Sequence, residues 1–409
     1  MKKSLMAAAL AAATLATTPV MAAELCDGLP RLDVTTPAGF CVGVLASGLK
    51  FPRGVLPLTT GDLLVTDMAG WTPNQGKLWL LKRQANGSYQ KQMLMDKLDR
   101  PNGIVQGPDG QIYVGVVKRI FRFDLRDPER RITDVIGGSS KVAPLPGQGL
   151  HLLTTMRFSP KGDLYVNVGS NTDHCEGADN QAPDPSKPCA AGEGKEPLAA
   201  IREYKMAWPA GTVASWSTYA HGLRNSMALA FHPATGALWQ AENARDAIQA
   251  AMPQLKSDED LPHEELNLIK AGQHYGWPYC YDNNLASPEY PKTDCAAKYV
   301  APQRLLPGHA APLGMTFYTA SRFPATYKNS LIIGYHGYRS NGHRLVALLP
   351  DAAGAPLGKS VELIKGWERK GKQGRGAPVD VKQGQDGDLY MADDHNGLVL
   401  KLHYAAPAK

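Results

Sequence analysis

The chain has 409 residues, of which 43% are hydrophobic and 20% are charged, and its net charge is +6. The positive surplus is spread along the chain without a basic block, so the composition does not indicate nucleic-acid binding. The length alone would fit two or three domains. However, no Gly/Ser linker, charge run or low-complexity break separates Leu25 from Tyr404, so we expect residues 23–409 to form one domain.

Residues 1–22 have the pattern of a secretory signal peptide. Two lysines precede an apolar run, Leu5–Ala16, and small residues, Val20 and Ala22, occupy the −3 and −1 positions of a cleavage site. The run is too short to span a bilayer, which disfavours a retained anchor helix. Removal of this peptide lowers the charge from +6 to +4, because it takes away two lysines and no acid. We therefore expect a periplasmic or secreted protein without an integral membrane segment.

The six cysteines form three local couples that lie far apart along the chain. Six cysteines allow 15 pairings, but short separations within each couple favour bridges between nearest neighbours. Thiolate metal binding is less favoured, because no Cys-x-x-Cys occurs. Disulfides agree with an oxidising compartment. The predicted bridges are Cys26–Cys41, Cys175–Cys189 and Cys280–Cys295.

One theme then recurs along the chain, after residues 25–50, which we expect to supply a first strand and an edge closure. Each copy has an Asp-Gly-like turn, a short apolar strand and a hairpin partner. A single hairpin cannot bury its apolar face, so the copies must stack. Six copies predict an all-β, six-bladed propeller of four-stranded antiparallel blades. A β-sandwich and a solenoid are disfavoured by the length and the uneven spacing. The turns begin at Thr60, Pro108, Pro160, Pro233, Lys328 and Gln385.

The loops at one end of a propeller converge on its axis, so we searched the polar loops for functional residues. His151 ends a Pro-rich loop, and Arg224 and Asn225 precede an apolar strand. Taken singly, each has an ordinary explanation: a hydrogen-bonded structural His, or an Arg paired with a surface carboxylate. Glu264 and Glu265 could likewise form a solvated face. These residues alone indicate only a secreted propeller with a polar central cleft.

In combination, the loops resemble the soluble quinoprotein sugar dehydrogenases, which use pyrroloquinoline quinone (PQQ) on a six-bladed propeller. The resemblance covers about residues 52–402. His309-Ala-Ala-Pro-Leu-Gly314 and Tyr335-His-Gly-Tyr338 are most similar to the sorbosone dehydrogenase branch. The other motifs that carry the resemblance, in chain order, are His151, Gly222-Leu-Arg-Asn225, Glu265-Leu-Asn-Leu-Ile269 and Tyr275-Gly-Trp-Pro278.

The resemblance implies a role for each matched residue. His151 matches the general base that takes the proton of the substrate hydroxyl, a task that suits a His near its ordinary pKa. Arg224 matches an Arg beside the quinone oxygens, where it would stabilise developing charge. PQQ carries three carboxylates, for which guanidinium groups are suitable partners. The implied cofactor contacts are Asn225, His309, Arg339 and Arg375.

The resemblance also implies Ca²⁺ against the cofactor, held largely by backbone carbonyls of Asn243, Ala244 and Arg245. Oxygen ligands suit this hard cation. Glu242 and Glu264 are candidates for a second, structural Ca²⁺. The expected partners are a sugar or sugar aldehyde and a soluble or respiratory electron acceptor, and the expected assembly is a monomer or dimer.

Two positions depart from the family pattern. Met227 stands where the glucose enzymes carry Gln, and Ser170 stands where a carboxylate would orient the base, although Asp173 is close by. Two other functions also stay open. One is a Ca²⁺-dependent hydrolase such as a lactonase, with its metal held by carboxylates and Asn in the channel. The other is a non-enzymatic propeller that binds a carbohydrate or a protein.

Overall fold

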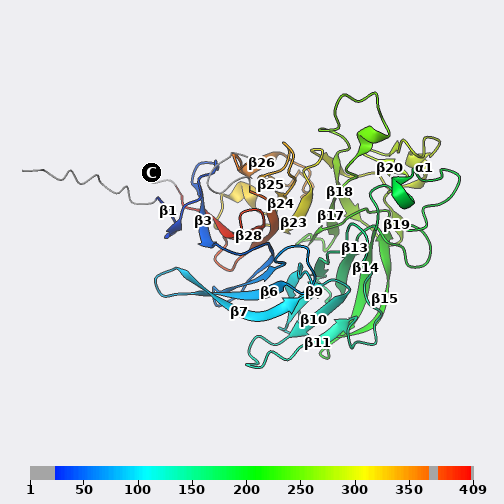
Figure 1. Cartoon of the computed structure of the whole chain (residues 1–409). Coiled ribbons are helices and arrows are strands. Elements are labelled where there is room, and N and C mark those ends of the chain that lie inside the picture. Colours follow the sequence, from blue (N-terminus) through cyan, green and yellow to red (C-terminus); the bar gives the residue numbers. More distant parts are fainter. Residues whose placement is uncertain (1–23, 368–375, 407–409) are drawn as a thin grey trace, which may run out of the picture.

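The computed structural model describes residues 24–367 and 376–406. The predicted signal peptide and Arg375 therefore lie outside the described residues. Six sheets of four or five strands are arranged as a six-bladed propeller, which confirms the predicted all-β fold, and two hairpins form separate two-stranded sheets. Figure 1 shows the sheets following one another in chain order, so that the red C-terminal strands return to the blue N-terminal ones.

Each blade is an antiparallel meander whose first strand lies nearest the axis. Blades 1 to 3 contain β4 (Pro52–Pro57), β5 (Leu63–Asp67), β6 (Gly76–Arg83) and β7 (Tyr89–Leu98); β8 (Ile104–Gln106), β9 (Ile112–Val116), β10 (Arg119–Phe123) and β11 (Thr133–Ile136); and β12 (Met156–Phe158), β13 (Leu164–Val168), β14 (Ala200–Ala207) and β15 (Thr212–His221). Blades 4 to 6 contain β16 (Ala228–Phe231), β17 (Leu238–Glu242), β18 (Glu264–Ile269) and β22 (Arg304–Leu306); β23 (Pro312–Phe317), β24 (Leu331–Tyr335), β25 (Arg344–Leu348) and β26 (Ser360–Ile364); and β27 (Pro378–Gln383), β28 (Leu389–Asp393), β29 (Leu398–Tyr404) and β3 (Phe40–Ala46).

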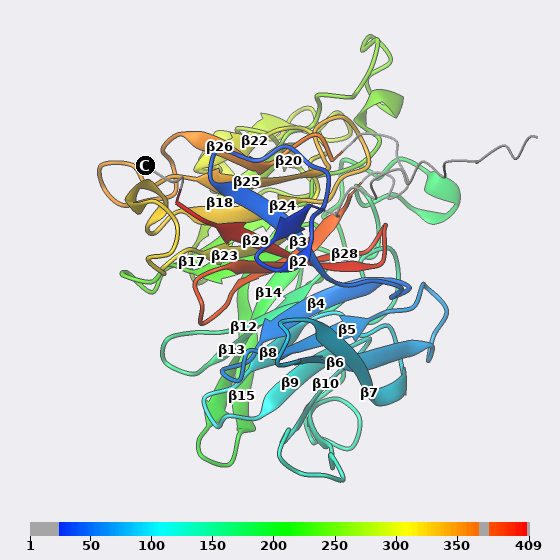
Figure 2. The ribbon, with the colours of Figure 1, turned by 90° about the vertical axis from the view of Figure 1, so that its left-hand side faces the viewer.

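The N-terminal strand β3 closes the ring, as expected for residues 25–50. It completes blade 6 by pairing antiparallel with β29, with Val42 opposite Leu402. Figure 2 shows this blue strand among the red strands of the last blade. The two ends of the described chain are thus joined in one sheet.

The recurring turn has the same place in every blade, between the first and second strands. One residue of each turn has a positive φ, a conformation that glycine adopts without steric cost and asparagine tolerates. Because each turn requires such a residue, the number of turns, and therefore of blades, could be counted from the sequence. The residues with positive φ are Gly61 (85°), Gly110 (76°), Gly162 (88°), Gly236 (68°), Asn329 (61°) and Gly387 (80°).

Insertions extend the blades on the side of blades 3 and 4. A fifth strand, β19 (Gln273–His274), pairs parallel with the end of β15, which was not predicted. The three predicted disulfides are present. No helix of the described residues is long and apolar enough to cross a membrane. The remaining elements are β1 (Leu25–Cys26), β2 (Leu29–Pro30), β20 (Cys280–Tyr281), β21 (Leu285–Ala286), the helix α1 (Cys295–Lys298) and the 3-10 turns η1 (Ala178–Asn180), η2 (Ile248–Ala250) and η3 (Ala325–Tyr327).

Apolar side chains fill the space between neighbouring sheets, and small residues let the inner strands meet near the axis. A Cβ atom on Gly54 of β4 would lie 2.4 Å from the Asn102 carbonyl oxygen. A Cβ atom on Gly314 of β23 would lie 2.4 Å from the Val379 carbonyl oxygen of the next blade. Only glycine allows this approach, which draws the loops at the ends of the inner strands together.

Candidate active site

A cavity of about 260 Å³ opens where these loops converge. Its walls come from residues at the start of the first strand, or after the end of the second strand, in several blades. The lining is mostly apolar, with a few converging polar groups, as is usual for small-molecule sites. The polar lining residues are Arg53, His151, Asn225, Asn243, His336 and Tyr338.

The hydrogen bonds of His151 involve only one of its two ring nitrogens. Its Nδ1 atom lies 2.9 Å from both the carbonyl oxygen and the Oγ atom of Ser170. A carbonyl oxygen can only accept, so Nδ1 carries the ring proton and Nε2 keeps its lone pair. The Ser170 hydroxyl donates to the Thr172 carbonyl oxygen at 2.6 Å, which leaves Oγ free to accept from the imidazole.

The pKa of His151 lies well below its ordinary range. Burial lowers it first, and the nearby Arg224 guanidinium lowers it further, from 6.5 to about 3. The expectation of a His near its ordinary pKa is therefore wrong. The imidazole is neutral at physiological pH, in the form that accepts a proton.

Arg224 lies behind the wall of this cavity, and it is 2% exposed. Its Nη1 atom donates to the Asn243 carbonyl oxygen at 3.1 Å, and its Nη2 atom donates to Asp173 at 2.7 Å and Asp246 at 2.9 Å. Its own carbonyl oxygen accepts from the Ser170 amide at 2.8 Å. Arg224 thus connects the residue that orients His151 with Asn243, and its guanidinium is not among the groups that line the cavity.

Asn225 and Asn243 lie side by side in the cavity wall. Asn243 Nδ2 donates to the carbonyl oxygens of Pro312 at 2.7 Å and Asn225 at 3.3 Å, which fixes its side chain. The Oδ1 atom of Asn225 is buried and has no hydrogen-bond partner among the described residues. A buried polar atom normally has a partner. Asn225 therefore offers an acceptor to a bound molecule.

Sequence reasoning missed a charged cluster on another part of the cavity. The buried carboxylate of Asp394 lies 2.5 Å from Arg53 Nη1 and 3.0 Å from His336 Nε2. Burial alone would raise the pKa of Asp394, but His336 and Arg53 hold it below its usual value. Their positions in the blades could have identified these residues. Arg53 lies at the start of the first strand of its blade, and His336 and Asp394 each follow the second strand of theirs. Asn225 and Asn243 hold corresponding positions in blade 4.

Two of the expected cofactor contacts, which belong to the β22–β23 and β24–β25 connections, bond to the long β17–β18 loop and do not line the cavity. His309 Nε2 lies 2.8 Å from the carbonyl oxygens of Asp258 and Leu261. Arg339 Nη1 donates to the Asp258 carboxylate at 2.8 Å. Neither side chain is among the groups that line the cavity. Both hold this loop in place.

The carboxylates beside the expected Ca²⁺ segment are buried. Glu264 and Glu265 are 3% and 9% exposed, so their interpretation as a solvated face is wrong. Burial raises the pKa of Glu264 to about 8 and that of Glu242 to about 7. Glu264 accepts the backbone amides of Ala244 at 2.6 Å and Ala311 at 2.8 Å.

The remaining residues of the segment are also engaged. The Arg245 guanidinium donates to Glu289 at 2.7 Å. Glu242 accepts the Asn225 amide at 2.6 Å and the Gln240 side chain at 2.6 Å. The segment thus brings together carbonyl and carboxylate oxygens, which are the donors that Ca²⁺ prefers.

Comparison with known proteins agrees with this geometry. A family model described as TrAA12-like matches residues 34–405. The chain belongs to the TrAA12-like family. The predicted resemblance to PQQ-dependent sugar dehydrogenases, a family of oxidoreductases, is thereby confirmed.

Among relatives, a PQQ-dependent sugar dehydrogenase of Hypocrea jecorina is 24% identical over 71% of this chain and 72% of its own length. Two uncharacterised proteins, from Borreliella burgdorferi and Synechocystis, are 29% and 26% identical. Those matches span about half of this chain, and 48% and 38% of the two relatives.

Solved structures share the fold. A calcium structure of the Trichoderma reesei enzyme of carbohydrate-active enzyme family AA12 has a TM-score of 0.71 at 20% identity, over 92% of this chain and 98% of that chain. The holo PQQ domain of a Coprinopsis cinerea pyranose dehydrogenase has a TM-score of 0.67 at 20% identity, over 92% and 99%. The PQQ-bound aldose sugar dehydrogenase of Streptomyces coelicolor has a TM-score of 0.59 at 20% identity, over 91% and 100%.

Proposed function

We propose that this protein is a PQQ-dependent dehydrogenase of sugars or sugar aldehydes, with His151 as its general base. The observation that carries the proposal is the neutral imidazole in the axial cavity, with its proton on Nδ1 and a free lone pair on Nε2. Such a ring can accept the proton of a substrate hydroxyl. Bound PQQ would supply the hydride acceptor.

The polar groups around the cavity suit the cofactor. PQQ carries three carboxylates, and the Arg53 guanidinium in the lining is a donor for such groups. The unpartnered Oδ1 atom of Asn225 can accept from an N–H group of the cofactor. Arg224 would then act through its positive charge, by stabilising negative charge that develops nearby and by holding Ser170 and Asn243 in place.

We further propose Ca²⁺ against the cofactor, held by carbonyl oxygens of residues 243–245. Asn243 lines the cavity, which supports this position, and its carbonyl oxygen, which accepts from Arg224 at 3.1 Å, would share its second lone pair with the ion. A second Ca²⁺ at Glu242 and Glu264 stays a prediction. All four of their carboxylate oxygens accept hydrogen bonds from the protein, so that ion would share them with these donors.

A periplasmic or secreted location and a sorbosone-type substrate belong to the same proposal. The three disulfides support an oxidising compartment. The aromatic rings of Trp71 and Tyr338, which are 55% and 54% exposed, border the cavity and can cover the apolar face of a sugar. Electrons would then pass to a soluble or respiratory acceptor.

The hydrolase alternative has less support. A hydrolytic Ca²⁺ site in the channel needs carboxylates around the metal. Within residues 24–367 and 376–406, no Asp or Glu lines the axial cavity. A propeller that only binds a ligand would not need the neutral, oriented imidazole of His151. We therefore favour the dehydrogenase.

One experiment tests the three functions. PQQ and Ca²⁺ are added to the purified apo-protein, the visible spectrum is recorded, and dye reduction is measured with a panel of aldoses and sorbosone. We expect a PQQ spectrum that bleaches with at least one sugar. Failure to bind PQQ would remove the proposed function, and binding without dye reduction by any sugar would favour a binding protein.

A further inference from the structure

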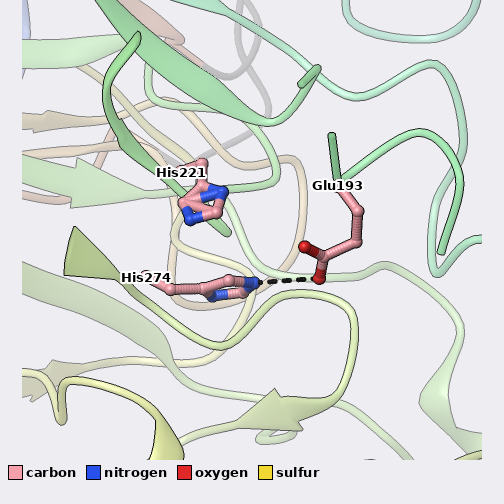
Figure 3. Close-up of side chains that lie close together, drawn as sticks. All are labelled: Glu193, His221 and His274. Carbon is pink, nitrogen blue, oxygen red and sulfur yellow. Dashed lines mark ion pairs between the residues drawn. The ribbon is translucent and has the colours of Figure 1, made fainter. Parts of the chain in front are cut away.

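Three metal-ligating side chains meet outside the axial cavity. His221 ends β15, His274 belongs to the parallel strand β19, and Glu193 lies in the loop between β13 and β14. Figure 3 shows the two rings and the carboxylate turned toward one another. Their ligand atoms all lie within 4.8 Å of one another, although the residues come from three separate segments. None of them lines the axial cavity, and the proposed dehydrogenase does not use them.

The surrounding structure fixes the carboxylate. Tyr279 donates its hydroxyl proton to Glu193 Oε1 at 3.0 Å and accepts the Cys189 amide at 2.8 Å. The Cys175–Cys189 disulfide closes the loop that leads to Glu193. Hydrogen-bond donors that hold a ligating group in this way orient the ligands of known metal sites. The side chain of Glu193 is about one-third exposed, so an ion can reach it from solvent.

The two imidazoles are fixed as well, and each has a nitrogen that makes no hydrogen bond, although His274 Nε2 faces the Glu193 carboxylate at 3.5 Å. Their ring centres lie 4.3 Å apart, and the ring of Tyr299 covers His274 at 4.5 Å. His221 Nδ1 and His274 Nε2 are buried and have no hydrogen-bond partner in the described part of the chain. Buried nitrogens normally have partners, so these two need an explanation.

The spacing fits a transition metal. His274 Nε2 lies 3.5 Å from Glu193 Oε1. Two ligands of a tetrahedral zinc ion, each bonded at roughly 2.0–2.1 Å, lie about 3.3 Å apart. Two nitrogens and one carboxylate favour Zn²⁺ or Cu²⁺ over the hard cations Ca²⁺ and Mg²⁺.

We propose that Glu193, His221 and His274 bind one divalent transition-metal ion, with water at the open position. The proposal is independent of the dehydrogenase function. Without metal, Gly276 donates its amide to His274 Nδ1 at 3.0 Å, so the neutral ring carries its proton on Nε2. A bound ion takes the place of that proton, which moves to Nδ1. Two N–H groups would then face each other at 3.0 Å, so the Gly276 amide must turn away from the ring. Binding thus costs one local hydrogen bond.

A second cluster of metal-ligating residues, Asp27, Asp388 and His403, is a poorer candidate. The Lys401 ammonium group already lies 2.7 Å from Asp27 and 2.9 Å from Asp388. This internal cation already bridges the two carboxylates and occupies the place that a metal ion would take.

The test uses untagged, chelator-treated protein titrated with Zn²⁺ by calorimetry. We expect one ion per chain, and at least 10-fold weaker binding in His221→Gln and in Glu193→Gln. His263→Gln is the matched control, because His263 also contacts a carboxylate, Asp282 at 2.8 Å, and should leave binding unchanged. Circular dichroism checks that each variant is folded.

Co²⁺ gives a readout that needs no variant. In the wild-type protein, a four-coordinate site with two imidazoles should give visible absorption bands that Zn²⁺ abolishes and Ca²⁺ does not. Absence of Zn²⁺ binding would overturn the proposal. So would unchanged affinity in His221→Gln, or a loss of binding confined to His403→Gln.

Discussion

At the scale of single residues, one serine decides how His151 works. Ser170 presents a carbonyl oxygen and a hydroxyl to Nδ1, and both are neutral. A carboxylate at this place would favour the charged imidazole and raise its pKa. With serine, burial and Arg224 prevail and the ring stays neutral. The orientation of the ring is kept while its basicity is lowered.

Removal of this ring should abolish turnover and spare the cofactor. We expect His151→Ala to bind PQQ as the wild type does and to lose about 10²-fold or more in kcat, because a general base contributes about that much. Spectroscopic PQQ titration and steady-state dye reduction measure the two quantities. His263→Ala, a histidine outside the cavity, should keep full turnover, and unchanged turnover in His151→Ala would refute the base assignment.

The pH dependence should reflect the low pKa. The proposed base is the unprotonated form of His151, and a pKa of about 3 keeps the ring in this form at every pH from 7 down to 5. We therefore expect kcat/KM to stay level over this range. In Ser170→Asp, the pH below which kcat/KM falls should rise by about one unit or more. Ser170→Ala keeps the bond from Nδ1 to the carbonyl oxygen and should retain the level profile, whereas a wild-type acid limb near 6.5 would contradict the assigned pKa.

The exposed ring of Trp71 should contribute to substrate binding. Since it borders the cavity, we expect Trp71→Ala to raise KM several-fold and to change kcat little, the pattern of lost uniform binding. Initial rates over a range of sugar concentrations measure both constants. Leu285→Ala, which removes an exposed apolar side chain away from the cavity, is the control. An unaltered KM in Trp71→Ala would exclude a contact with the sugar.

The site was predictable where a motif and a strand end coincide. His151, Asn225 and Asn243 line the cavity, as expected of loops that converge on the axis. Arg224 does not line the cavity, because its guanidinium forms ion pairs with Asp173 and Asp246. No local sequence pattern predicts those pairs. Arg53 and His336 carry no motif that distinguishes them from a surface Arg or a structural His.

At the scale of elements, a repeated link between two strands explains the buried Glu242. Its carboxylate accepts the amide of Asn225, the residue three positions before β16, at 2.6 Å. Asp67 accepts the amide of Phe51 at 2.8 Å in blade 1, and Asp393 accepts that of Ala377 at 3.0 Å in blade 6. An acid at the end of the second strand thus holds the backbone that enters the first.

Loss of this link in blade 4 should disturb the cofactor site. We expect Glu242→Ala to lower the free energy of unfolding by about 1–3 kcal/mol, since a buried amide loses its acceptor. It should also weaken PQQ binding, because Asn225 is released. Asp393→Ala breaks the corresponding link beside Ala377, which does not line the cavity, and should lower stability with little change in PQQ affinity. Urea unfolding and PQQ titration provide the comparison, and an unchanged PQQ affinity in Glu242→Ala would argue against the link.

At the scale of the whole molecule, ring closure depends on β3 and its neighbours. The Cys26–Cys41 disulfide ties this strand to the β1–β2 hairpin. We expect the double variant Cys26→Ala/Cys41→Ala to lose about 2–3 kcal/mol of unfolding free energy, as for other loops of this length. Limited proteolysis should then cut before residue 46. The control, Cys280→Ala/Cys295→Ala, removes a disulfide that closes a loop of equal length and should leave β3 protected from the protease. Equal cleavage before residue 46 in both double variants would show that β3 is held by strand pairing alone.

The blade count was predictable because each turn needs a residue that tolerates positive φ, and such residues can be counted. The parallel pairing of β19 with β15, and the pairing of β22 with β18 across a long insertion, were not predictable. Both depend on contacts between segments that are distant in sequence, for which local propensity gives no signal.

The joining of β3 to β29 also sets an order of events during synthesis. The first strand of the ring leaves the ribosome long before its partner, the last one, has been translated. Until then β3 exposes an edge that could capture a strand of another molecule. A nascent chain that stops short of residue 398 would keep that edge open, so a truncated product would be prone to misassembly.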